Sequence, residues 1–108
     1  MFIQLTDYPD AMTCLKGSIE TTFSALTRLF GEPLEGDDYK VSGEWIFKGP
    51  NGSVFTVYDW KSTALYDTDL PSVADFRATS KPSTFNIGGD KPAFEFIVWL
   101  DSKLRGAA

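Results

Sequence analysis

The chain has 108 residues, which is enough for one ordinary domain and too few for two. Hydrophobic residues make up 43% of it and aromatic residues 15%, so buried apolar side chains can offset the entropy lost on folding, which excludes a wholly disordered chain. The 15 acidic and 10 basic residues give a formal net charge of -5, which disfavours binding to a long nucleic acid.

The first ten residues, MFIQLTDYPD, lack the basic region and the long apolar run of a secretory signal, so no signal peptide is expected. No apolar run approaches the roughly 18 residues that a membrane-spanning helix requires. The chain's one cysteine, Cys14, suits a reducing cytoplasm. Residues 2–5 predict a short edge strand, and Tyr8-Pro9-Asp10 predicts the turn that ends it.

A strand and then a helix are predicted next. Residues 12–19 are β-prone, and Gly17 within them indicates a bulge or a close approach of another segment. Residues 22–30 predict a helix with a threonine as N-cap, and Gly31 and Pro33 end it. Its apolar residues fall on one stripe: Phe23, Leu26, Leu29 and Phe30.

The clearest pattern is a β-hairpin formed by residues 39–48 and 53–61, joined by a Gly-Pro-Asn-Gly turn at 49–52. Alternation places Trp45 and Phe47 on one face of the first strand. The second strand carries large side chains on both faces, so we expect one of its faces to be covered by something other than the first helix.

Residues 62–83 show little periodicity and predict a long irregular loop. A short strand over 84–87, a turn at Gly88-Gly89 and a helix over 93–104 with Asp90 as N-cap are expected to follow. The residues assigned to the core face of that helix are Phe94, Ile97, Val98, Leu100 and Leu104, with Phe96 and Trp99 on its flanks.

This order of elements predicts a single α+β domain over residues 1–108, an antiparallel sheet of three to five strands with two helices packed on one face. Such an arrangement leaves the second face of the sheet exposed. If that face carries aromatic side chains, it is a candidate surface for self-association or ligand binding.

Two segments suggest ligand binding. Glycines 88 and 89, at the start of a predicted helix, would offer backbone N–H groups to a phosphate; the alternative is that they only turn the chain. Tyr58 and Trp60 could stack on a base, with Asp59 accepting hydrogen bonds from it and Lys61 offsetting phosphate charge. The alternative is that these aromatics pack against a neighbouring sheet or subunit, while Asp59 and Lys61 lie in water.

Charged residues suggest two further features. The cations Lys40, Lys48, Lys61, Arg77, Lys81 and Lys91 could gather into a pocket for a small anion, or lie scattered on the surface. The acidic sets, Glu32, Glu35, Asp37 and Asp38 in one segment and Asp67, Asp69 and Asp75 in another, lack calcium-loop spacing and are expected to be solvated. The absence of histidine removes most acid–base and nucleophilic catalysis, so no catalytic residue, metal ligand or cofactor is predicted.

Four motifs in this order are similar to those of a family of small phage proteins. They are Phe30-Gly31-Glu32-Pro33, Lys40-Val41 with Glu44-Trp45, VFTVYDWK over Val54–Lys61, and Phe85-Asn86-Ile87-Gly88-Gly89 before a terminal helix. The family patterns they resemble are FGxP, KVxxEW, TIYDWK and WxIGG. Phe85 stands where the family commonly has tryptophan.

The family looks like the phage anti-CBASS nucleotide sponges. The resemblance implies a non-enzymatic homo-oligomer, a tetramer, that sequesters a cyclic dinucleotide immune signal in the cytoplasm of the infected bacterial host. The candidate ligand-binding residues are Tyr58, Trp60, Lys61, Arg77, Gly88, Gly89 and Lys91.

Two other functions stay open at this stage. The acidic surface could mimic a nucleic acid and inhibit a host nuclease or effector protein, as an anti-CRISPR or anti-restriction protein would. A hydrolase that uses aspartate or glutamate ranks last.

Overall fold

A five-stranded antiparallel sheet with three helices forms the fold in a computed structural model that describes residues 2–9, 12–35 and 41–106. The strands are β1 (Ile3–Leu5), β2 (Cys14–Thr21), β3 (Glu44–Lys48), β4 (Val54–Tyr58) and β5 (Ser83–Gly89); the helices are α1 (Phe23–Phe30), α2 (Val73–Ala78) and α3 (Phe94–Gly106). The strand order is β1-β3-β4-β5-β2, so β1 and β2 are the two edges. The predicted α+β class and antiparallel sheet are confirmed.

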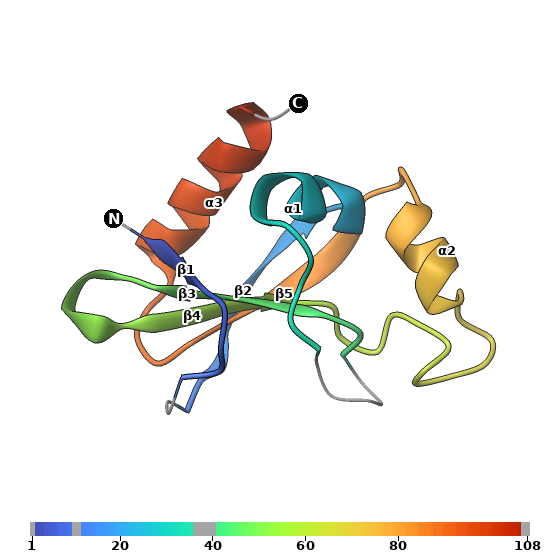
Figure 1. Cartoon of the computed structure of the whole chain (residues 1–108), viewed down its shortest axis with the longest axis horizontal. Helices are drawn as coiled ribbons and strands as arrows, with labels where there is room; N and C mark the ends of the chain where they lie inside the picture. The colour runs from blue at the N-terminus through green and yellow to red at the C-terminus, as the bar shows by residue number, and fades with distance from the viewer. Residues whose placement is uncertain (1, 10–11, 36–40, 107–108) are drawn as a thin grey trace.

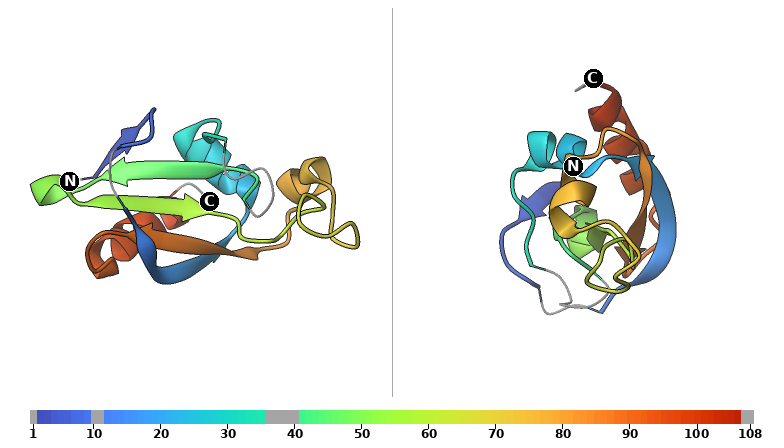
Figure 2. Two further views of the ribbon diagram at one scale, coloured as in Figure 1. Left: turned by 90° about the horizontal axis from the view of Figure 1, so that it is seen from below. Right: turned by 90° about the vertical axis from the view of Figure 1, so that its right-hand side faces the viewer.

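Helices α1 and α3 lie on the same face of the sheet, as expected, while α2 lies beyond one end of it, next to α1 (Figures 1 and 2). The core fills the space between the sheet and these helices. Its most deeply buried side chains are Trp45, Phe47, Phe85, Phe96, Leu26, Ile87, Leu100 and Val57. Within the described ranges, none of the helices combines the length and apolar character needed to span a bilayer.

Helix α1 forms where the sequence predicts it. Thr22 is the N-cap, and its hydroxyl accepts a hydrogen bond from Ala25 N at 3.1 Å. Gly31 ends the helix with a φ of 80°, a conformation that glycine adopts without steric cost. The carbonyl of Gly31 accepts a hydrogen bond from Trp45 Nε1 at 2.9 Å, so the end of the helix is tied to β3.

The predicted hairpin is also confirmed. Strands β3 and β4 pair over five residues each, and the connecting turn at Pro50–Gly52 has positive φ angles at Asn51 (60°) and Gly52 (74°). The predicted alternation is confirmed, since Trp45 and Phe47 face the helices. The beginning of the first predicted strand, at residues 39 and 40, lies outside the described residues, as does Asp10 of the first predicted turn.

Strand β2 carries the irregularity that Gly17 predicts. Its pairing with β5 shifts between Leu15 and Gly17, and a Cβ on Gly17 would lie 2.8 Å from Ile97 Cδ1. The position therefore serves both as a bulge and as a place where α3 packs closely on the sheet.

Four predictions around α2, β5 and α3 are wrong. The segment 62–83 is not irregular throughout, because Ser72 caps the six-residue helix α2 by accepting a hydrogen bond from Asp75 N. The glycine pair 88–89 is not a turn but the end of β5, paired with β4 on one side and β2 on the other.

The core face of α3 also differs from the predicted one. Phe96, placed on a flank, is fully buried, whereas Phe94 is 77% exposed and Val98 is 54% exposed. The helix begins at Phe94 rather than Ala93, and nearly every residue in its first two turns is apolar, so spacing alone does not select the buried stripe. Asp90 is not its N-cap; the Asp90 carboxylate accepts a hydrogen bond from Val54 N at 2.9 Å.

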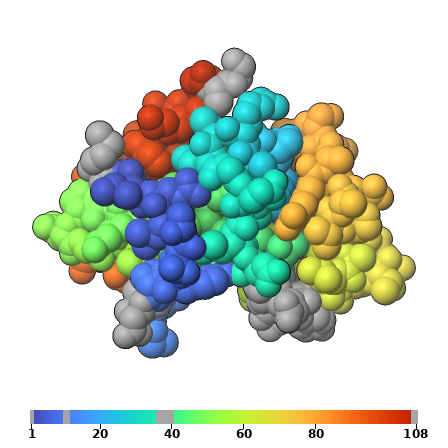
Figure 3. Space-filling model, viewed as in Figure 1, coloured from blue at the N-terminus to red at the C-terminus, as the bar shows by residue number. Residues whose placement is uncertain are grey.

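The sheet face opposite the helices is partly covered, contrary to expectation. β1 and β2 are at opposite edges of the sheet, and residues 5–9, from the end of β1 onward, line a cavity of about 530 Å³ on this face together with Val54 and Lys48. Ile46, on the same face, is 1% exposed. The sequence predicts that one face of the second hairpin strand is covered by something other than the first helix. The N-terminal segment covers part of that face. Figure 3 shows this segment beside the chain that follows α1, to which the Tyr8 hydroxyl donates a hydrogen bond at the Glu35 carbonyl.

Thr56, in β4 on this face, holds a buried hydroxyl that has no hydrogen-bond partner among the described residues. Replacing it with valine keeps the shape and removes the unpaired hydroxyl, so Thr56→Val is expected to stabilise the fold by about 1 kcal/mol and to raise the melting temperature by roughly 4 °C. Thermal denaturation measures this. The control is Thr84→Val on the exposed part of β5, expected to change stability by less than about 0.5 kcal/mol. A lower melting temperature for Thr56→Val would show that the hydroxyl is paired.

Candidate ligand-binding pocket

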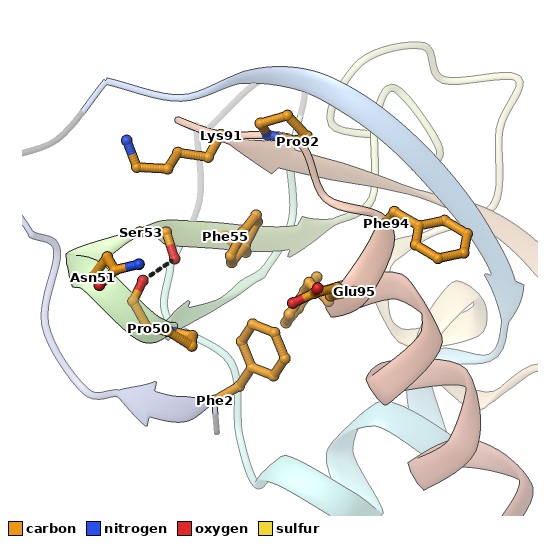
Figure 4. A pocket seen from close by; sticks show the side chains of 10 residues that line it. Phe2, Pro50, Asn51, Ser53, Phe55, Lys91, Pro92, Phe94 and Glu95 are labelled. Carbon is orange, nitrogen blue, oxygen red and sulfur yellow. Dashed lines mark hydrogen bonds between the residues drawn. The ribbon is translucent and has the colours of Figure 1, made fainter.

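An open pocket lies between the hairpin turn and the start of α3, and its volume of about 380 Å³ is in the range of small-molecule sites (Figure 4). Its apolar lining comes from segments far apart in sequence: Phe2 before β1, Phe55 in β4, and Phe94 and Phe96 in α3. Asn51, Ser53, Lys91 and Glu95 supply its polar groups. The pocket thus combines aromatic surface with one amine and one carboxylate.

The aromatic part of the pocket is rigidly packed. The rings of Phe55 and Phe96 are stacked, 4.9 Å apart and 6° from parallel, and the Phe2 ring meets both edge-on at 5.8 and 5.3 Å. Two glycines make room for it: a Cβ on Gly89 would lie 2.9 Å from the Phe55 ring, and one on Gly49 would lie 2.9 Å from the Phe2 ring. Gly89 therefore contributes to this pocket through packing.

Lys91 and Phe94 form the exposed part of the rim, with Phe94 well separated from the packed rings in Figure 4. The loop that carries Lys91 is anchored to β4 through Asp90 and Val54. The Asp90 carboxylate accepts from Val54 N at 2.9 Å, and Asp90 N donates to the Val54 carbonyl at 3.2 Å. The backbone next to Lys91 is therefore fixed at the pocket, and its exposed side chain extends from there, with the amine drawn away from Phe94 in Figure 4.

The predicted aromatic group lies at the other end of β4. Tyr58 is half-buried and meets Trp60 edge-on at 6.2 Å, and Trp60 is 43% exposed. The Lys61 ammonium lies 5.6 Å from the centre of the Trp60 ring and 4.9 Å from that of Tyr66. The structure thus brings Tyr58, Trp60 and Lys61 together, apart from Lys91.

Asp59 is neither a solvent-exposed nor a ligand-facing carboxylate. It is fully buried and accepts hydrogen bonds from the main-chain N–H of Ser42 at 3.0 Å and of Gly43 at 3.1 Å. The Ser42 hydroxyl donates a third at 2.9 Å. These bonds hold the chain that enters β3 against the end of β4, so Asp59 has a structural role.

The remaining predicted residues lie elsewhere. Arg77 is in α2, where its Nη2 donates to the Ser42 carbonyl at 3.0 Å. Gly88 is buried between Thr56 of β4 and Leu15 of β2, and a Cβ on it would lie 2.5 Å from Thr56 Oγ1. The geometry of a helix N-terminus, on which the ligand prediction for the two glycines depends, is absent because both are strand residues.

The predicted cation pocket does not form among the described cations. Each of four cations lines a different hollow: Lys91, Lys48, Arg77 and Lys81. Lys61 follows the far end of β4, and Lys40 lies outside the described residues. The described acidic residues of the two predicted sets are on the surface, and Asp37 and Asp38 lie outside the described ranges. In the described part of the chain, no group of three or more His, Cys, Asp or Glu side chains could hold a metal ion.

Three groups on the covered sheet face have shifted pKa values. Burial raises the pKa of Glu44, and the nearby Tyr8 hydroxyl partly offsets this. Burial also raises the pKa of Tyr8, reinforced by the charge of Glu44, and that of Tyr58, partly offset by a hydrogen bond with Asn86. Since Glu44 has a higher pKa in the folded chain, its contribution to stability declines as the pH rises through that pKa.

Sequence reasoning identified Lys91 but not the aromatic residues around it. Phe94 was assigned to the core, yet an aromatic residue two positions after Pro92, at a helix start, is a signal that could have indicated an exposed rim. Phe2 joins the pocket only through the pairing of β1 with β3. The chain matches no model of a known protein family and no curated protein, so the four-motif resemblance stays an expectation.

Proposed function

We propose that this chain binds a nucleotide in the pocket at the start of α3 and holds it without chemical change, as a sponge for a cyclic dinucleotide. The pocket itself carries the proposal: its lining combines the aromatic residues Phe2, Phe55 and Phe94 with Lys91. Aromatic rings stack on any base, and an ammonium forms charge-assisted hydrogen bonds with phosphate. A net charge of -5 further favours a small anion over a long nucleic acid.

The volume of about 380 Å³ suits one base with its phosphate, which is half of a cyclic dinucleotide. A two-fold pair of chains would present two such pockets to the two halves of one ligand. The proposal therefore includes a homo-oligomer. The tetramer that the family resemblance implies would consist of two such pairs. Tyr58 and Trp60 are the proposed subunit contact, because Trp60 presents 43% of its surface at the far end of β4.

In this proposal the sponge acts in the cytoplasm of an infected bacterial host and lowers the free concentration of the immune signal. Affinity comes from stacking and from charge-assisted hydrogen bonds, and no group of the chain is required to act on the ligand.

Titration calorimetry of the full chain against a panel of cyclic dinucleotides tests the proposal. Lys91→Glu is expected to weaken binding at least about tenfold, because a hydrogen bond to a charged group contributes roughly 1.5–3 kcal/mol. The matched control is Lys81→Glu, which changes the net charge equally at an exposed position outside the pocket and is expected to change the affinity less than twofold.

Two further measurements complete the test. Light scattering is expected to give an oligomer, and chromatography after long incubation with magnesium is expected to recover the nucleotide intact. A monomer that releases no heat with any member of the panel refutes the proposal, and so does hydrolysis of the nucleotide.

A further inference from the structure

Another hollow lies between α1 and α2, away from the aromatic pocket, and has a volume of about 430 Å³. It is lined by Phe23, Ser24, Thr27, Arg28, Glu32 and Arg77. Helix α2 lies beyond the end of the sheet opposite the hairpin turn in Figure 1, so the two pockets are far apart along the molecule. Two of the chain's few cations therefore face one cavity.

Neither arginine is neutralised within the described part of the chain. The ion pair formed there joins Arg105 to Asp101 on α3, and neither Arg28 nor Arg77 has a carboxylate at such a distance. In a chain with 15 acidic residues, two unpaired arginines on one hollow are a notable concentration of positive charge.

Arg77 is also held in place. Its guanidinium lies 4.5 Å from the centre of the Phe23 ring, and Nη2 donates to the Ser42 carbonyl at 3.0 Å. Its Nε is buried and has no acceptor among the described residues, which is an unfavourable state for a charged donor. The guanidinium is thus pre-positioned, and its Nε lacks an acceptor among the described residues.

Hydroxyl groups complete the site. Ser24 Oγ lies 3.2 Å from Thr22 Oγ1; when Thr22 is the donor, the Ser24 proton is available to a ligand. Thr27 lines the same wall, but its hydroxyl donates to the Phe23 carbonyl. The donors available to a ligand are therefore the two guanidinium groups and one hydroxyl.

We infer that this hollow binds a tetrahedral oxyanion of the phosphate type, through Arg28 and Arg77. Planar guanidinium groups form paired hydrogen bonds with phosphate oxygens, which an isolated ammonium does not. Glu32, on the same lining, opposes the anion and limits the affinity. The site is independent of the proposed nucleotide pocket.

Titration of the ¹⁵N-labelled full chain with sodium phosphate, at an ionic strength kept constant with sodium chloride, tests the inference. Saturable shifts of amide resonances are expected at Ser24, Arg28 and Arg77. Arg28→Gln is expected to raise the Kd roughly three- to tenfold, and Glu32→Gln to lower it by a similar factor. Both side chains are exposed, so neither change is expected to unfold the protein.

Arg105→Gln is the matched control, because it removes an exposed arginine remote from the hollow and is expected to leave the Kd unchanged. A parallel titration with glycerol 2-phosphate distinguishes esterified from free phosphate as the source of the anion. Absence of saturable shifts at these residues with either probe, or equal effects of Arg28→Gln and Arg105→Gln, overturns the inference. Lys91→Glu is expected to retain phosphate binding here, so failure of this inference is distinguishable from failure of the proposed nucleotide site.

Discussion

Replacing Asp59 with alanine is expected to lower the free energy of unfolding by about 2–6 kcal/mol, because each buried donor left without an acceptor costs roughly 1–3 kcal/mol. The carboxylate is the acceptor for the N–H groups of both Ser42 and Gly43, and it is fully buried, so water cannot replace it without a change in the fold. A loss of this size is a large part of the roughly 5–15 kcal/mol that stabilises a typical domain.

Asp59→Asn is expected to fall between alanine and the native chain. Its amide oxygen can still accept one set of hydrogen bonds, but its NH₂ group cannot accept those that Ser42 makes to the second carboxylate oxygen. Urea denaturation of the native chain, Asp59→Asn and Asp59→Ala measures the order of their stabilities. Asp69→Ala, at an exposed carboxylate, is the control and is expected to change stability by less than about 0.5 kcal/mol. If Asp59→Ala unfolds at the same urea concentration as this control, the carboxylate does not hold the β3 entry.

Phe96→Ala is expected to cost about 3–5 kcal/mol, the usual effect of deleting a buried aromatic ring from a core. The Phe96 ring is completely buried, stacked on Phe55 and in contact with the rings of Phe2, Phe47 and Trp99. Partial relaxation around the resulting cavity determines where in this range the loss falls.

Phe94→Ala, two residues earlier in the same helix, is the matched comparison. Its ring is 77% exposed, so the stability change is expected to stay within about 0.5 kcal/mol. Chemical denaturation of both variants tests the phase of α3. Equal losses, or a larger loss for Phe94→Ala, would mean that the helix presents the face originally assigned from the sequence.

Local sequence signals predicted the elements that are delimited by a capping residue, a turn residue or a glycine. Thr22 and Gly31 delimit α1, the Asn51-Gly52 pair marks the hairpin turn, and Gly17 marks the bulge of β2. Each of these features depends on neighbouring residues only, through a cap, a positive φ or the absence of a Cβ. The arrangement as one α+β domain, with helices on one face of a sheet, follows from the order of such elements.

The candidate site was predicted less well. Lys91 was identified, but Gly89 was assigned as a phosphate donor at a turn and lies in a strand, where it makes room for the Phe55 ring. A glycine pair indicates that a side chain would be unfavourable at those two positions. This is true both in a tight turn and in a strand crowded by its neighbours. The sequence does not distinguish the two, because the crowding atoms come from other strands.

The sequence by itself determined that this chain folds as one acidic α+β domain, with its first helix and its hairpin at stated residues, because these depend on composition and on contacts between neighbours along the chain. Only the tertiary structure decided which face of α3 is buried, what Asp59 binds, and that Phe2 meets Lys91 and Phe94 at one pocket. The physical reason is that these features are contacts between segments brought together by strand pairing and helix packing, and no local pattern encodes the partner.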